Sequence, residues 1–312
     1  MNKEQLINRI LEENTLAESK GLLPVIPEIF HFRVKKTVSS EPGMFVLCYL
    51  EIEDPCNEEI DYRIPFNALM TKLSSQYGEM RTRIEFTITC FEQIFQDYNC
   101  FQATNKLEVQ ILGHSLLFYC KLYNPREHFC CQTISVIPLF VMIQACIASC
   151  FQLFSMGIYL HGAISIGLGS ELTYGFYGAG MGDVVELASQ TPFPFIRFDP
   201  KIQTFISRYK LKWHQNEDLF HSSIQNSICE LYVPSSSSSG LQEVYKIVDF
   251  LGQEAFSDIT RYLKPDSGNQ DKMDQKDLFI KLKKHLQEKS VRSFDLKLFE
   301  DYVSKCEEIW KL

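Results

Sequence analysis

Residues 156–200 decide the fold; they read MGIYLHGAISIGLGSELTYGFYGAGMGDVVELASQTPFPFIRFDP. The first part, 158–166, is apolar and rich in β-branched residues, which predicts a strand. The glycines in 167–169 predict a turn, after which a second short strand follows. The segment that begins at 178–180 has apolar residues at helical spacing, and 194–199 predicts another buried strand. The predicted order is strand, glycine turn, helix, strand.

Three segments upstream predict the rest of a sheet and its cover. Residues 44–52, MFVLCYLEI, are almost continuously apolar, as a buried central strand should be. Residues 57–98 predict a connector and one or two helices, because apolar side chains recur at helical spacing over 84–95. Residues 105–122 predict a strand hairpin whose turn is 112–115.

The segments downstream predict an appendage behind a linker. Residues 201–211 form an amphipathic helical pattern, and 228–233 predict a short strand that closes the sheet. Five serines and a glycine then mark a flexible linker at 235–240. Beyond it, 241–263 and 278–312 predict helices. We therefore expect an N-terminal arm (1–40), a main domain (41–234), the linker (235–240) and a helical C-terminal appendage (241–312).

Composition limits the function classes. The chain has 312 residues, 45% of them hydrophobic, which is ample for a packed core. Its formal net charge of -8 argues against nucleic acid as the main partner, because binding to phosphates needs a clustered positive field. The eleven cysteines include no Cys-x-x-Cys pair, and several lie in apolar runs. We expect reduced core thiols and a cytoplasmic location.

One segment, 132–156, contains no charged residue and is long enough to cross a bilayer. Its glutamines and serines, together with Pro138, argue instead for a helix buried under a sheet or in a dimer. No cluster of Lys and Arg flanks it to set an orientation. The buried helix is the favoured interpretation, and a membrane contact is the alternative.

These motifs resemble class III nucleotidyl cyclases, in particular the divergent bacterial branch that includes the Pycsar-type pyrimidine cyclases of anti-phage defence. That family carries Arg-Gly-Ala-Ile-(Ser/Thr)-x-Gly on a late strand, then a Gly-Pro-Ala-like helix start and a Pro-Arg-Ile strand. The matching positions here are 161–167, 178–180 and 194–196. The resemblance covers about residues 40–235. It implies an α+β fold with a ferredoxin-like, mixed, mostly antiparallel sheet covered by helices.

Several polar positions depart from the family pattern. The metal-binding aspartate at the end of the first strand corresponds to Glu51, and the second one, in the hairpin turn, corresponds to His114. His161 and Phe195 stand where the family has arginines, and Glu186 is two places from the expected Leu-Glu. The resemblance makes Glu51 and His114 the candidate metal positions. It makes His161 and Gly178 the candidate nucleotide-binding positions.

Framework residues are thus kept while residues needed only for chemistry have changed. This contrast favours a catalytically degenerate cyclase-homology-domain protein that acts by dimerisation or by binding a nucleotide or a partner, without a metal cofactor. The alternative is an active divergent cyclase that uses magnesium or manganese (Mg or Mn). Such an enzyme would convert a nucleoside triphosphate, UTP or CTP by the resemblance, to a 3′,5′-cyclic nucleotide and pyrophosphate in anti-phage signalling. The resemblance also implies a homodimer, or a heterodimer with a catalytic cyclase.

Overall fold

The computed structural model of the chain describes residues 43–53, 65–99, 106–122, 136–172, 175–209, 217–234, 242–252, 284 and 293–310. Apart from Leu172, all of these belong to one compact unit. The predicted arm (1–40) and the serine linker (235–240) lie outside the described residues. The division of the chain into arm, main domain, linker and appendage stays a prediction.

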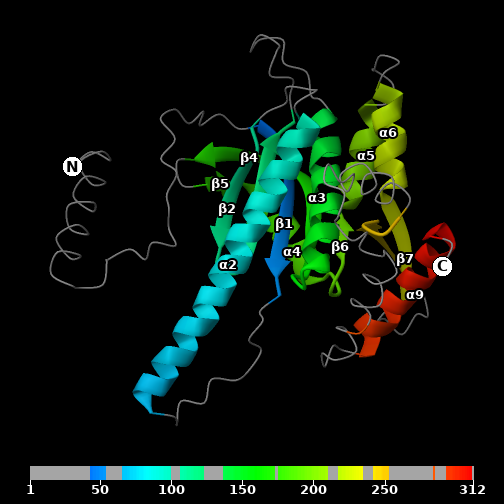
Figure 1. Cartoon of the computed structure of the whole chain (residues 1–312). Helices are drawn as coiled ribbons and strands as arrows, with labels where there is room; N and C mark the ends of the chain where they lie inside the picture. Colours follow the sequence, from blue (N-terminus) through cyan, green and yellow to red (C-terminus); the bar gives the residue numbers. More distant parts are fainter. Residues whose placement is uncertain are drawn as a thin grey trace, which may run out of the picture. The chain divides into compact units, whose positions relative to one another are not determined.

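The first half of the described chain forms a ferredoxin-like core (Figure 1). Its elements are β1 (Gly43–Ile52), α2 (Phe66–Asn99), β2 (Glu108–Leu112), β3 (Ser115–Lys121), α3 (Ile137–Ser155) and β4 (Leu160–Leu172). The four strands lie in the order β2-β3-β1-β4, and each neighbouring pair is antiparallel. The predicted central strand, hairpin and helices are therefore confirmed.

The second half of the chain extends this sheet. Its elements are β5 (Gly175–Tyr177), α4 (Ala179–Ser189), β6 (Ile196–Phe198), α5 (Pro200–Tyr209), α6 (Glu217–Asn226), β7 (Ile228–Pro234), β8 (Gln242–Val248) and α9 (Ser293–Trp310). Strand β6 runs parallel to β4, while β8 is antiparallel to both β6 and β7. The predicted α+β class with a mixed, mostly antiparallel sheet is confirmed.

The helix predicted over 241–263 is wrong at its start, because residues 242–248 form strand β8. This strand pairs along its whole length with β7, on the other side of the serine linker. Its sequence, QEVYKIV, contains two valines, an isoleucine and a tyrosine, which favour a strand once a neighbouring strand offers hydrogen bonds. The sheet therefore continues past the predicted domain boundary.

The sheet has two different faces. Alternate residues of β1, among them Cys48 and Leu50, pack into a large core with α2 and α3, which lie side by side in Figure 1. The intervening residues, among them Leu47 and Tyr49, pack into a smaller core with α4 and β5. Because side chains alternate along a strand, Glu51 belongs to the face that α4 covers.

Helix α3 is a core helix, as favoured for the uncharged segment. Residues 137–154 are long and apolar enough to cross a membrane by length and composition, and 83% of this window is buried inside the protein. Cysteines of the apolar runs are also buried and free: Cys48, Cys90, Cys120, Cys146 and Cys150. The packing confirms their assignment as core thiols, and the cytoplasmic location stays a prediction.

The turn predicted at 167–169 is wrong, because β4 continues without interruption to Leu172. The glycines serve close packing instead. A Cβ atom on Gly167 would lie 2.4 Å from the Cα atom of Gly180 in α4, and a Cβ atom on Gly169 would lie 2.1 Å from the Phe176 ring. The absence of side chains there lets α4 and β5 approach the strand.

Phe195 has a structural role that explains why it is apolar. Its ring is fully buried and lies 5.6 Å from the Tyr302 ring and 6.1 Å from the Phe299 ring, both on α9. An arginine at this position would place a charge inside an aromatic cluster. The position that the family resemblance assigned to an arginine therefore belongs to the core, where α9 packs.

Candidate functional site

Glu51 lies near the end of the central strand, between the two strands that flank it. It pairs with Ser115 of β3 on one side and with His161 of β4 on the other. All three side chains belong to the face covered by α4, because they share a row across the sheet. The structure thus brings together Glu51 and one of the two candidate nucleotide-binding residues.

Both oxygen atoms of the Glu51 carboxylate have hydrogen-bond partners. The Tyr49 hydroxyl donates to Oε1 at 3.1 Å, and the His161 Nε2 atom lies 3.1 Å from Oε2. The hydrogen bond from His161 lowers the pKa of Glu51 most, partial burial opposes this, and Tyr49 adds a further lowering. The carboxylate is therefore ionised and held from two sides.

His161 is positioned to donate to Glu51 rather than to a ligand. Its Nδ1 atom is buried and has no hydrogen-bond partner within the described part of the chain. Its ring meets Phe193 edge to face at 5.9 Å between centroids. A proton on Nε2 satisfies the contact to Glu51, so this hydrogen bond occupies the ring edge that faces the carboxylate.

His114 lies in the turn between β2 and β3, close to the end of β1. Its carbonyl oxygen accepts a hydrogen bond from the Ile52 amide at 3.1 Å, and its side chain is exposed. His114 is near enough to add a small lowering of the Glu51 pKa. The adjacency of Glu51 and His114 expected from the resemblance is therefore present.

The residues around Glu51 do not fit a magnesium or manganese site. Magnesium requires near-octahedral coordination by oxygen atoms, and the resemblance implies two facing carboxylates for this purpose. Here the second position is an imidazole, and the carboxylate of Glu51 is engaged by Tyr49 and His161. Among the residues that the structure describes, no three His, Cys, Asp or Glu side chains are grouped so that they could hold a metal ion.

Gly178, the other candidate nucleotide-binding residue, lies near the far end of β4. A Cβ atom on it would meet the Cα atom of Gly169 at 2.5 Å, and its φ angle of 152° suits glycine. Eight residues of extended strand separate Gly169 from His161, a span of roughly 26 Å. The structure therefore does not bring His161 and Gly178 into one site.

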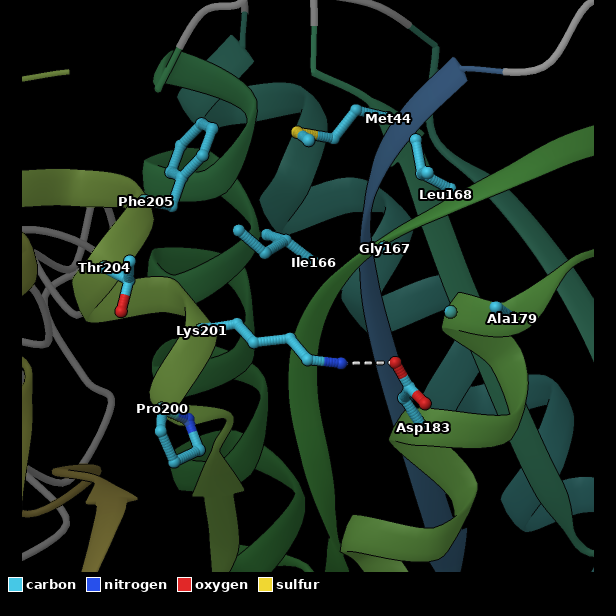
Figure 2. A pocket seen from close by; sticks show the side chains of 11 residues that line it. Met44, Ile166, Gly167, Leu168, Ala179, Asp183, Pro200, Lys201, Thr204 and Phe205 are labelled. Carbon is cyan, nitrogen blue, oxygen red and sulfur yellow. Dashed lines mark hydrogen bonds and ion pairs between the residues drawn. The ribbon is translucent and has the colours of Figure 1, made fainter. Parts of the chain in front are cut away.

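A cleft of about 780 Å³ opens near the Gly178 end, between β4, α4 and α5 (Figure 2). Its lining is largely apolar: Met44, Ile166, Leu168, Ala179 and Phe205. Lys201 and Asp183 face each other across it and form an ion pair, which raises the pKa of Lys201. The cleft therefore offers an apolar surface beside a paired lysine and aspartate.

Asp199, directly before α5, is a buried polar residue that the sequence interpretation did not single out. It accepts hydrogen bonds from the Ser165 hydroxyl at 2.5 Å and from the Lys201 amide at 2.8 Å. Its Oδ2 atom also lies 4.0 Å from the Lys201 ammonium. The sequence signal was an aspartate followed by Pro200, the pattern of a helix N-cap with proline at the first helical position.

Comparisons with known proteins find similar solved structures but no matching family. No family model matches the chain, and no curated protein matches it. Solved structures that are similar include the catalytic core of a rhodopsin-guanylyl cyclase with converted specificity in complex with ATPαS, at 9% identity and a TM-score of 0.33. Another is an adenylate/guanylate cyclase/hydrolase from Silicibacter pomeroyi, at 11% identity and a TM-score of 0.31. Both matches cover 67% of this chain, and they cover 97% and 98% of those chains, respectively.

Proposed function

We propose that this chain is a cyclase-homology-domain protein that does not cyclise nucleotides and acts by pairing with another chain or by binding a ligand. The observation that carries the proposal is the engagement of Glu51 by His161 and Tyr49. In a working site of this class, two metal ions held by carboxylates would neutralise the triphosphate and activate the ribose hydroxyl. Here the Glu51 carboxylate instead accepts hydrogen bonds from Tyr49 and His161.

The cleft supports the same proposal. A triphosphate needs a surplus of positive charge, and arginine is the residue best suited to grip it. The ammonium group of Lys201 is already paired with Asp183, and the buried Asp199 lies close by. The cleft lining contains no arginine among the described residues. These groups suit an uncharged or apolar ligand better than a polyphosphate.

Product analysis tests the proposal. We expect no cyclic nucleotide when the purified chain is incubated with each of the four nucleoside triphosphates and either magnesium or manganese, and the products are analysed by mass. An active class III cyclase run in parallel provides the positive control. Formation of any cyclic nucleotide and pyrophosphate above the no-protein background would contradict the proposal.

The alternative function, an active divergent cyclase, has one observation in its favour. Glu51 lies at the end of a central strand next to the hairpin turn, and its side chain is 26% exposed. If product is formed, replacing Glu51 with alanine separates two mechanisms. Loss of activity would assign Glu51 a role at the metal, whereas unchanged activity would exclude that role. A part in anti-phage signalling and a preference for UTP or CTP belong to this alternative.

A further inference from the structure

The N-terminal half of α2 extends beyond the sheet that the rest of the helix covers. Helix α2 has 34 residues and α3 has 19, so they are about 51 Å and about 28 Å long. Figure 1 shows that the N-terminal end of α2 runs beyond the strands and beyond α3. None of the described side chains from 67 to 83 is buried, and Ile84 is the first buried side chain of the helix. We call residues 67–83 the distal half of α2.

A single apolar seam runs from the distal half into the core. Its members recur at alternating steps of three and four residues: Met70, Leu73, Tyr77, Met80 and Ile84. The same steps continue through the core at Thr87, Phe91 and Ile94, all of which are buried. This is the heptad pattern of a helix that pairs with another helix. In the distal half, Met70 is 44% exposed and Tyr77 is 68% exposed.

We propose that the distal half of α2 pairs with the distal half of α2 in a second copy of this chain, in antiparallel orientation. In this register Met70 faces Met80 of the second copy, and Leu73 faces Tyr77. Each exposed seam residue then packs against an apolar partner. The two-fold axis passes between the two helices at the level of Ser75, whose own side chain lies on the opposite side of the helix from the seam.

The charge distribution argues for a second copy as the occupant. A seam residue near a two-fold axis lies beside the same residue of the second copy. A charged side chain there would therefore be repelled by the identical charge of its copy. The six residues from Leu73 to Gly78 read LSSQYG and carry no charge. Ser74 and Gln76 flank the seam at this point and can each meet their own copy without repulsion.

Packing within the chain argues for the antiparallel orientation. From Ile84 onward the seam residues pack into the chain's own core, where α2 contacts α3. A parallel partner would run along the same line and would have to diverge at this point. An antiparallel partner ends near Ile84, and the two folded bodies lie at opposite ends of the paired helices.

This inference rests on the proposed function, because it names the surface and the partner for pairing. Sedimentation analysis of the full chain tests it. We expect the wild-type chain to be a dimer at micromolar concentration. A charge at position 77 would be buried in the pair, so Tyr77→Glu should raise the dissociation constant by about tenfold or more. Ser75→Glu is the matched control, because Ser75 is exposed on the side of the helix opposite the seam; it should remain dimeric.

Cross-linking tests the orientation. An oxidised mixture of Met70→Cys and Met80→Cys chains should form more disulfide-linked dimer than either variant alone, with wild type as the background. Cross-linking of each variant alone would indicate parallel helices and overturn the proposal. A monomeric wild-type chain would also overturn it, even if Tyr77→Glu lowered its melting temperature, because a segment of the same chain would then cover the seam. Cyclic nucleotide formation would refute the proposed function and leave the pairing unaffected.

Discussion

Replacing Gly162 with alanine should destabilise the protein by about 3 kcal/mol or more, enough to unfold a marginal domain. A Cβ atom on Gly162 would lie 1.9 Å from the carbonyl oxygen of Tyr49 and 3.1 Å from the Cα atom of Leu50. Both atoms belong to the backbone of the central strand, which is packed on both faces. Since backbone cannot move aside as a flexible side chain can, β1 and β4 would have to separate. Urea unfolding followed by circular dichroism measures the effect.

Gly78→Ala is the matched control for this substitution. Gly78 lies on the exposed surface of α2, and a Cβ atom there would meet nothing within 4 Å. Alanine has a higher helix propensity than glycine, so this variant should gain about 0.5 to 1 kcal/mol. Equal stability of the two variants would show that a Cβ atom fits at Gly162, which would contradict the close approach of β4 to β1.

Tyr302→Phe should cost about 2 kcal/mol and loosen α9 from the sheet. The buried hydroxyl of Tyr302 accepts a hydrogen bond from the Leu251 amide at 2.9 Å and donates one to Asp249 Oδ1 at 2.8 Å. Phenylalanine keeps the ring in the aromatic cluster but removes one hydrogen bond to the buried Leu251 amide and takes from the Asp249 carboxylate its strongest donor. Tyr177→Phe, at a tyrosine that is 71% exposed, should change stability by less than about 0.5 kcal/mol.

The effect of Tyr302→Phe should depend on pH. Burial raises the pKa of Asp249, and the hydroxyl of Tyr302 lowers it, offsetting part of that rise. A raised pKa means that ionising Asp249 reduces folding stability as the pH rises above its ordinary pKa near 3.8. Without the hydroxyl this reduction becomes larger. The loss in Tyr302→Phe should therefore be greater at neutral pH than in acid, and an equal loss at both would exclude a role for Asp249.

The sheet could be predicted largely from local pattern. The apolar run at 44–52, the hairpin at 105–122 and the helix after Gly178 each carry their own periodicity. Strand β8 could not be recognised in this way, because seven residues after a linker resemble the start of a helix until β7 is known to lie beside them. The glycines of β4 were misinterpreted for a similar reason. Turns and close packing both require glycine, and only the position of α4 distinguishes them.

The residues of the candidate site could be predicted from the sequence, but the contacts between their side chains could not. Glu51 and His161 were both identified, yet their contact depends on the register between β1 and β4, which no local pattern specifies. The resemblance made both His161 and Gly178 candidate nucleotide-binding positions, because 178–180 match the Gly-Pro-Ala-like helix start. The length of β4 instead carries it to the other end of the strand. The seam of α2 was overlooked in its distal half, where the exposure of Met70 and Tyr77 becomes visible only in the structure.

The state of the Glu51 carboxylate decides whether this site can hold a metal ion. If His161 and Tyr49 hold it in place of a metal ion, calorimetric titrations of manganese into the wild-type chain and into Glu51→Gln should superimpose. Glutamine keeps the length of the side chain, removes its charge and replaces one acceptor oxygen with an NH2 donor, so that at most one neutral oxygen remains to bind a metal ion. Stoichiometric manganese binding to the wild-type chain that disappears in Glu51→Gln would contradict the proposed function and would make Glu51 a metal ligand.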